Sequence, residues 1–327
     1  MNSTDQKILI RVPNWIGDAV ISTGFIEACK KENPGAKITI LAHQRVAELF
    51  EANPYVNDIM AFNKEEGLRR IVRSLKNRAF DRAYILPLSF SSALICFLAG
   101  IKQRIGHGTE LRNLLLTESL RYSQTDFRSR HILYGYTALL ERDIAPRPPK
   151  IYLTDEEIEK ASKKIFGLKF RKEDLVGFGP GATYGQAKMW PAENWIQLGR
   201  KLSEGGKRVM IFGSASENVL CRDIAMGIGH GTTNLAGDLS LRESAALLHL
   251  VPSFITNDTG VMHLAAASGA KVTAIFGSTN PDWTGPWGEG HKVIYDKQPC
   301  SPCYKRTCRY GHYDCLKKIT PDDIIAT

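Results

Sequence analysis

Short apolar segments alternate with helical patterns along nearly the whole chain, and this alternation limits the possible folds more than any other feature. The segments with the length and composition of buried strands are 7–12, 37–42, 58–62, 82–87, 175–181, 208–213, 253–257 and 271–277. The stretches between them place apolar residues at the three- and four-residue spacing of helices. Strands that alternate with helices in this way predict parallel sheets with helices on both faces.

The sequence predicts two such sheets. The segment "IAPRPPK" at 144–150 contains three prolines in seven residues, and prolines of this density end a helix and are typical of a linker. A length of 327 residues also fits two domains of roughly 150 residues each. We therefore expect an α/β protein with two Rossmann-like, doubly wound parallel-sheet domains that face a cleft, divided into residues 1–145 and 146–327.

Ligands of such sheets bind beyond the carboxyl ends of the strands, so the loops at these ends are the candidate sites. The loop "FGPGATYGQAKMW" at 178–190 has the glycines of a dinucleotide fingerprint, but the next helix cannot begin before Pro191. Fingerprint glycines must open the helix directly, so the loop argues against NAD binding. Its Thr183 and Lys188 instead fit an anion such as a diphosphate. The alternative is a polar turn with an exposed lysine.

The segment "ITNDTGVMHLAAASG" at 255–269 is the second candidate site. It predicts a strand, a turn at Asp258, Thr259 and Gly260, and then a helix. A helix N-terminus offers free N–H groups and a partial positive charge, which suit a diphosphate, and His263 lies one turn into this helix. The alternative is that Asp258 or Thr259 is an ordinary N-cap and that His263 is a half-buried structural residue.

Two acidic residues follow other predicted strands. Asp18 ends the loop "RVPNWIGDAV", where apolar neighbours raise a carboxyl pKa and favour a general base; the alternative is an N-cap. Glu217 in "GSASENV" has the position of a ribose or base ligand. Its alternative role is that of an acid in the first turn of a helix.

The seven cysteines form two groups. Cys29, Cys96 and Cys221 lie in apolar helical patterns and are expected to be buried. The other four, Cys300, Cys303, Cys308 and Cys315, have a spacing in which only the first pair fits a zinc site. We therefore favour reduced thiols in a loop over a metal site.

The charge and the absent motifs narrow the function. A net charge of +9 favours anionic partners. The sequence contains no P-loop and no Asp-x-Asp pair for a divalent ion, so we expect no metal and no cofactor requirement, Mg²⁺ included. It also shows no signal peptide and no apolar stretch of the ~20 residues that cross a bilayer, which predicts a cytoplasmic protein.

Taken together, these segments resemble the ADP-heptose:lipopolysaccharide heptosyltransferases, family 9 glycosyltransferases with the GT-B fold. The resemblance runs from "ILIRVPNWIGDAVISTGFIEACKKENPGAKITILA" through "PGATYGQAKMWPAENW" and "TNDTGVMHLAAASGAKVTAIFGSTNPDWTGPWG" to the cysteine segment. The forms "PNWIGDAV", "AKMWP" and "CSPC" look most like the heptosyltransferase II branch. In GT-B proteins a C-terminal helix crosses back onto the first domain, and "ITPDDIIA" is similar to its beginning.

The resemblance implies an inverting transfer of L-glycero-D-manno-heptose from ADP-heptose to heptosyl-Kdo2-lipid A, in synthesis of the lipopolysaccharide inner core. It implies an acceptor-binding N-terminal domain and a C-terminal domain that binds the nucleotide sugar. The partners are then ADP-heptose, a lipid A-linked acceptor and, transiently, the cytoplasmic face of the inner membrane, with no nucleic acid.

The resemblance also assigns residues to roles. The catalytic aspartate of the family matches Asp18, and its diphosphate-binding lysine matches Lys188, beside Thr183. Other donor-binding positions match the ribose-contacting Glu217 and the group Asp258, Thr259, Gly260 and His263.

Alternative functions stay open at this point. Within the family, the acceptor could belong to step I or III, or the donor could be a related ADP-sugar. Outside it, an NAD-dependent enzyme would require a true fingerprint. A non-catalytic anion- or nucleic-acid-binding protein would gather basic residues and aromatics on one face, for which "KRTCRY" is the sole indication.

Overall fold

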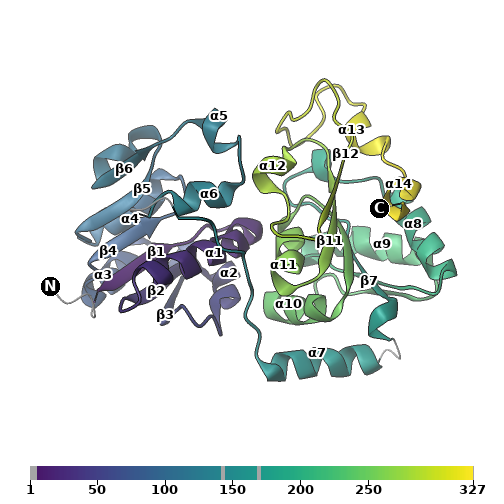
Figure 1. Ribbon diagram of the computed structural model, residues 1–327, viewed down its shortest axis with the longest axis horizontal. Coiled ribbons are helices and arrows are strands. Elements are labelled where there is room, and N and C mark those ends of the chain that lie inside the picture. The colour runs from purple at the N-terminus through teal and green to yellow at the C-terminus, as the bar shows by residue number, and fades with distance from the viewer. Residues whose placement is uncertain (1–5, 141–143, 168–170, 327) are drawn as a thin grey trace. The chain divides into compact units, whose positions relative to one another are not determined.

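The computed structural model describes residues 6–140, 144–167 and 171–326 of the chain (Figure 1). It divides into two compact units, Met1–Tyr152 and Leu153–Thr327. Within the described residues, no helix is long and apolar enough to cross a membrane.

The first unit is built on a sheet of six parallel strands in the order β3-β2-β1-β4-β5-β6. The chain adds strands on one side of β1 and then returns to add β4 on its other side. The loops after β1 and β4 therefore diverge, and such a switch point is where doubly wound sheets bind ligands. The strands are β1 (Lys7–Arg11), β2 (Lys37–His43), β3 (Asp58–Phe62), β4 (Arg82–Ile85), β5 (Gln103–Gly108) and β6 (Glu118–Arg121).

Successive side chains of β4 face opposite layers of helices, as the two-residue period of a strand requires. Tyr84 packs its ring on Phe25 of α1 (Ile16–Glu32), with centroids 5.4 Å apart. Its neighbours Ala83 and Ile85 join the apolar cluster of the other layer. That layer consists of α3 (Leu68–Arg78), α4 (Phe90–Leu98) and the 3-10 helix η3 (Glu110–Leu115), whereas α6 (Ile132–Thr137) packs beside α1. The short elements are α2 (Gln44–Ala47), η1 (Glu48–Phe50), η2 (Lys64–Glu66) and α5 (Gln124–Phe127).

The second unit repeats this topology. Its six parallel strands have the order β12-β11-β10-β7-β8-β9, which places the switch point between β7 and β10. The strands are β7 (Leu175–Gly179), β8 (Arg208–Ile211), β9 (Thr232–Asn234), β10 (Ser253–Asn257), β11 (Lys271–Phe276) and β12 (Lys292–Tyr295).

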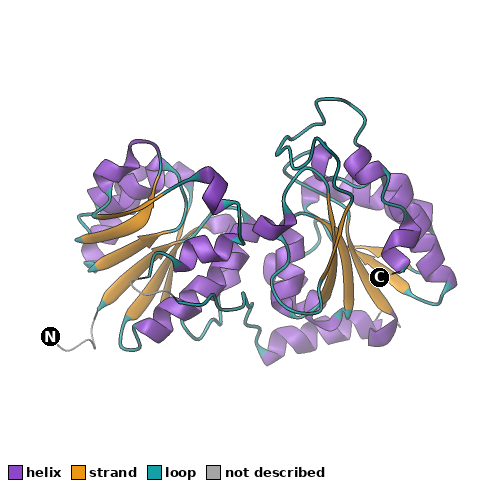
Figure 2. Cartoon of the chain, turned by 45° about the horizontal axis from the view of Figure 1, so that its top comes forward, coloured by secondary structure: helices purple, strands orange, loops and turns teal. Residues whose placement is uncertain are grey.

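Helices cover both faces of the second sheet (Figure 2). Phe178 of β7 packs on Trp195 of α8 (Ala192–Glu204), with ring centroids 4.9 Å apart, and α9 (Asn218–Ile228) joins the same apolar cluster. On the other face α10 (Leu241–Leu250) packs beside α11 (Gly260–Ser268). The remaining elements are α7 (Asp155–Gly167), η4 (Lys172–Asp174), η5 (Gln186–Lys188), η6 (Ala215–Glu217), α12 (Pro281–Thr284), α13 (Asp314–Lys317) and α14 (Pro321–Ile325).

The strands predicted from apolar segments are present, and the two parallel sheets of the expected fold class are confirmed. The elements outside the predicted segments include the edge strands β6 and β12 and helix α7. The edge strands carry mostly exposed or half-buried residues. Helix α7 buries only Ala161 and Ile165, so none of the three has the apolar pattern of a buried element.

The proline-rich segment belongs to the first unit. The N–H of Lys150 donates to Oγ1 of Thr23 over 2.9 Å, and the ring of Tyr152 packs on Tyr55 with centroids 6.0 Å apart. The chain consequently divides after Tyr152, later than the boundary placed at residues 145 and 146. Prolines prevented helix formation here without detaching the segment from the sheet unit before it.

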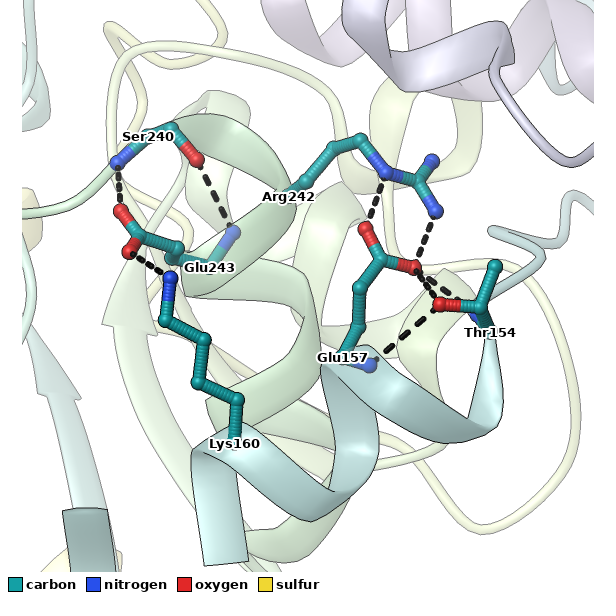
Figure 3. Close-up of polar contacts among 6 residues, drawn as sticks. All are labelled: Thr154, Glu157, Lys160, Ser240, Arg242 and Glu243. Atoms are coloured by element: carbon teal, nitrogen blue, oxygen red, sulfur yellow. Dashed lines mark hydrogen bonds and ion pairs between the residues drawn. The ribbon is translucent and has the colours of Figure 1, made fainter. Parts of the chain in front are cut away.

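Polar contacts hold α7 against α10 (Figure 3). The guanidinium of Arg242 donates to both carboxylate oxygens of Glu157, over 2.5 and 2.6 Å. The N–H and the hydroxyl of Thr154 donate to the same carboxylate. Hydrogen bonds from Arg242 lower the pKa of Glu157 to about 2, against burial, which acts in the opposite direction. This pair anchors helix α7 to α10.

We predict that Glu157→Gln lowers the free energy of unfolding of the second unit by about 2–3 kcal/mol at neutral pH, because the largely buried Arg242 loses its charged hydrogen bonds with Glu157. The folded-state pKa lies below the ordinary 4.5. The stabilisation is therefore present above pH 4.5 and lost as the pH falls toward about 2. Urea unfolding followed by tryptophan fluorescence checks this, since the second unit contains Trp190, Trp195, Trp283 and Trp287.

Lys160→Met is the matched control. Lys160 contacts Glu243 of α10 over 3.5 Å, but both side chains are exposed, so its loss should cost at most about 1 kcal/mol. Equal effects of the two substitutions, or a Glu157→Gln effect that persists unchanged at pH 2.5, would contradict the anchoring role.

Candidate functional site

Two charged residues meet at the switch point of the second unit. Lys188 follows β7 and Asp258 follows β10, and these strands are neighbours in the sheet. The Nζ of Lys188 lies 2.5 Å from Oδ2 of Asp258, and their side chains are only 13% and 5% exposed. The hydroxyl of Thr279, after β11, donates to the same Oδ2 over 2.5 Å. Three adjacent strand ends thus share one largely buried polar centre.

The loop between β7 and α8 does not form a dinucleotide turn. The strand ends at Gly179, a single 3-10 turn follows at Gln186–Lys188, and α8 begins only at Ala192. The expectation that the glycines do not open a helix is confirmed. They allow close contacts instead: Gly185 has a φ of 148°, and a Cβ there would lie 2.5 Å from the carbonyl oxygen of Arg306.

A segment from the C-terminal region crosses this loop. The N–H of Ala187 donates to the carbonyl of Arg306 over 3.0 Å, and the hydroxyl of Tyr184 donates to the carbonyl of Tyr304 over 2.7 Å. The Tyr184 ring contacts two cations, with Nζ of Lys188 4.9 Å and Cζ of Arg306 5.6 Å from its centroid. The loop that carries Lys188 is therefore held by hydrogen bonds to the segment at Tyr304–Arg306 and by the cation contacts of the Tyr184 ring.

The turn after β10 has the predicted form. Thr259 is the N-cap residue of α11 and forms no side-chain cap, while Gly269 ends the helix in the left-handed conformation. Asp258, proposed as an alternative N-cap, is not one, because its carboxylate contacts Lys188 and Thr279 instead. His263 is buried rather than half-buried. The first-turn N–H groups of α11 thus receive no cap from the Thr259 side chain.

Glu217 has the structural role that was its alternative. Its Oε2 accepts from the N–H and the hydroxyl of Ser214 over 2.8 and 2.7 Å in a capping box. The rest of its carboxylate lies against the loop after β7, since a Cβ on Gly181 would be 2.2 Å from Oε1. Glu217 therefore reaches the same strand ends as Lys188. Thr183 is exposed on the loop between them.

Asp18 lies in the first turn of α1, the helix that follows β1 at the switch point of the first unit. It does not end a loop, because α1 begins at Ile16 and Asp18 occupies its first turn. The N-cap alternative is wrong for this residue: the N-cap position belongs to Trp15. Burial, with a contribution from the charge of Asp18, raises the pKa of Tyr136 well above its usual range. Asp18 thus lies within electrostatic reach of Tyr136 on α6.

The cysteines divide into the predicted buried group and a second group near the C-terminus, in which Cys300, Cys303 and Cys308 lie outside helices and strands, whereas Cys315 lies in α13. Cys29, Cys96 and Cys221 are buried. In the second group, burial and the neighbouring thiols of Cys300, Cys303 and Cys308 raise the pKa of Cys315 to about 11. Among the described residues, no three His, Cys, Asp or Glu side chains are arranged to hold a metal ion.

The sequence reasoning missed partners that strand order brings to these sites. Thr279 follows β11. Because ligands bind beyond the carboxyl ends of parallel strands, its position after a predicted strand was a signal that could have identified it. Asn257 is buried beside Asp258, where its amide accepts from the N–H of Trp190 over 3.1 Å and donates to the carbonyl of Pro180 over 2.6 Å. No sequence signal pointed to Tyr136, which comes from a distant helix.

Comparisons with known proteins agree with this geometry. The sequence profile of glycosyltransferase family 9 (heptosyltransferase) matches residues 68–314. Lipopolysaccharide heptosyltransferase 2 of Salmonella typhimurium is 29% identical over 336 residues, which cover 98% of this chain and 97% of the relative.

Solved structures show the same likeness. The structure of E. coli ADP-heptose lipopolysaccharide heptosyltransferase II has a TM-score of 0.84 at 27% identity, covering 98% of this chain and 97% of the other. A family 9 glycosyltransferase from Veillonella parvula has a TM-score of 0.90 at 20% identity. The match covers 100% of this chain and 96% of the other. These structures confirm the expected two-domain fold.

We predict that Lys188→Met lowers the free energy of unfolding of the second unit by about 3 kcal/mol, because it leaves the carboxylate of Asp258 buried without a cation. Adding Asp258→Asn removes that unpaired charge, so the double variant should be less destabilised than the sum of the single variants. Urea unfolding of all four proteins measures this coupling. Strictly additive effects would show that the two side chains do not interact.

Proposed function

The chain belongs to glycosyltransferase family 9, the heptosyltransferase family, and we propose that it transfers heptose from ADP-heptose to the inner core of lipopolysaccharide. The observation that carries the proposal is the likeness to lipopolysaccharide heptosyltransferase 2 of Salmonella typhimurium, which extends over 98% of this chain. A likeness over both units covers the parts required for the donor and for the acceptor.

The second unit is the proposed donor site. The N-terminus of α11, at Thr259 and Gly260, presents backbone N–H groups and the positive end of the helix dipole, which suit the diphosphate of an ADP-sugar. Lys188 adds a cation at the neighbouring strand end. An ammonium has three N–H donors, so Lys188 keeps donors for a phosphate while it is paired with Asp258.

The other donor-binding residues have supporting roles in this proposal. Asp258 positions Lys188, and Glu217, which lies against the loop after β7, accepts from the ribose. Thr183 is exposed on that loop, beside the phosphate position. His263 is buried in the first turn of α11, the turn whose N–H groups would face the diphosphate.

The first unit supplies the proposed general base. The carboxylate of Asp18 takes the proton from an acceptor hydroxyl, whose oxygen forms a bond to the anomeric carbon as the bond to the diphosphate breaks. The electron pair of that bond leaves with ADP, whose new charge Lys188 and the α11 N–H groups stabilise. Each such donor typically contributes ~3–4 kcal/mol to the transition state. Attack in line with the leaving group inverts the anomeric configuration.

We propose heptosyl-Kdo2-lipid A as the acceptor and the cytoplasmic face of the inner membrane as the place of reaction. The net charge of +9 supports this assignment, since acidic sugars, lipid phosphates and an anionic leaflet all attract a basic protein. We propose that no metal or other cofactor takes part, because Lys188 and a helix N-terminus supply the charge stabilisation that a divalent ion would otherwise provide.

The test is a transfer assay with purified protein, ADP-heptose and acceptors that carry either no heptose or one. We expect product only with the acceptor that carries one heptose, and the same rate in excess chelator. Product with the heptose-free acceptor would assign the first step instead. A loss of activity in chelator that Mg²⁺ restores would contradict the metal-free scheme.

We further predict that Asp18→Asn lowers the transfer rate by about 10²–10⁴, which is the usual contribution of a general base, and leaves the affinity for ADP-heptose unchanged. Single-turnover kinetics and calorimetry separate the two effects.

Asp155→Asn is the control for this variant. Asp155 also lies in the first turn of a helix, α7, away from the switch points, so its substitution should leave transfer intact. A wild-type rate in Asp18→Asn would remove Asp18 from the catalytic role.

A further inference from the structure

Helix α4 of the first unit is apolar on both sides. Its inner residues, including Ala93 and Cys96, join the buried cluster beneath the helix. The outward positions 90, 94, 97 and 98 follow the spacing of a single helix face and are all apolar (Phe90, Leu94, Phe97 and Leu98), while Ser91 is the one exposed polar residue of the helix. Phe97 is 44% exposed, and no residue of α4 is charged. A helix on the surface of a water-soluble protein normally carries polar residues at such positions.

The neighbouring η3 extends this apolar surface. It packs beside α4, and its Leu111 and Leu114 are 72% and 80% exposed. Residues three apart lie on the same side of a 3-10 helix, so both leucines project from one face. Arg112, between them, is fully buried and donates to the carbonyl of Pro87. The buried arginine orients η3 and leaves the two leucines in solvent.

Basic residues border the apolar surface. Helix α3 also packs beside α4 and contains no acidic residue. Its exposed stripe consists of Arg69, Arg73 and Lys76, and no carboxylate of the described part of the chain pairs with any of these three. At the far end of α4, the guanidinium of Arg104 lies 5.3 Å from the Phe97 ring centroid and donates to the carbonyl of Leu115 over 2.7 Å.

An apolar centre with a basic border matches the boundary between lipid acyl chains and anionic headgroups. Exposed leucines enter the acyl region, while arginine and lysine contact headgroup phosphates. A protein partner would have to bury the same leucines and also neutralise the row of cations on α3.

We propose that the α4–η3 surface, made of Phe90, Leu94, Phe97, Leu98, Leu111 and Leu114, docks the enzyme on an anionic bilayer, with the basic stripe of α3 on the headgroups. The choice of partner rests on the proposed function, in which the acceptor is anchored in a membrane.

The surface begins at the correct edge of the sheet for this role. Helix α4 follows the carboxyl end of β4, which pairs with β1, and Asp18 lies in the first turn of the helix that follows β1. The hydroxyl of Thr109 donates to the carbonyl of Leu88 over 2.7 Å and ties the start of η3 to the same edge. A lipid-anchored saccharide that leaves the bilayer beside this surface is thus directed to the edge that carries Asp18.

The test is co-sedimentation of the full chain with vesicles of phosphatidylethanolamine and phosphatidylglycerol. Wild-type protein is expected to bind these vesicles, and to bind zwitterionic phosphatidylcholine vesicles much more weakly. Leu111→Ser with Leu114→Ser should lower the partition coefficient at least about tenfold. Because both side chains are exposed, the thermal midpoint should not change. Heptose transfer to a deacylated, water-soluble acceptor should be retained, whereas transfer to an acceptor in vesicles should fall.

Phe166→Ser is the matched control, since Phe166 is 82% exposed in the second unit, and it should bind vesicles as wild type does. Unchanged vesicle binding by the double-leucine variant, or an equal loss in the control, would overturn the proposal. So would a wild-type dimer that the leucine substitutions dissociate, because the surface would then join two copies. The protein could bind vesicles through the leucines and yet show no heptosyl transfer. That result would support the docking surface and refute only the proposed function.

Discussion

A lysine and an aspartate buried side by side remain charged only if their attraction and further hydrogen bonds offset the loss of solvation. Around Lys188 and Asp258, the Thr279 hydroxyl donates to the same carboxylate oxygen and the Tyr184 ring contacts the ammonium. These contacts connect the ends of three adjacent strands. The pair therefore fixes the position of the loop after β7 relative to the first turn of α11.

This arrangement has a consequence for anion binding. A free lysine would present a full positive charge, whereas a lysine paired with aspartate presents orientated donors with little net charge. Most of the attraction for a diphosphate then has to come from the α11 N–H groups, which the Thr259 side chain leaves uncapped. In this scheme Lys188 contributes orientated N–H donors as much as positive charge. Donors that are already orientated need little reorganisation during the reaction.

Both units place their functional candidates by the same rule of sheet topology. In each, the strand order reverses direction beside the first strand, and the loops that diverge there carry Asp18 in one unit and Lys188 with Asp258 in the other. The first unit also carries the apolar surface of α4 and η3, which starts at the edge that holds Asp18. Within this unit, the helix that carries the proposed catalytic carboxylate and the helix that begins the proposed membrane contact thus follow two neighbouring strands, β1 and β4.

The sequence by itself determined the buried strands, the two-sheet architecture and the loops in which the site lies, because each of these depends on local patterns of apolar residues. Edge strand β6 and helix α7 lacked such patterns, so the sequence did not predict them. Only the tertiary structure decided which loops meet. The partnership of Lys188 with Asp258 and Thr279, and the position of Asp18 near Tyr136, depend on strand order and helix packing. Contacts between residues so far apart in the chain cannot be predicted from the local sequence pattern around either residue.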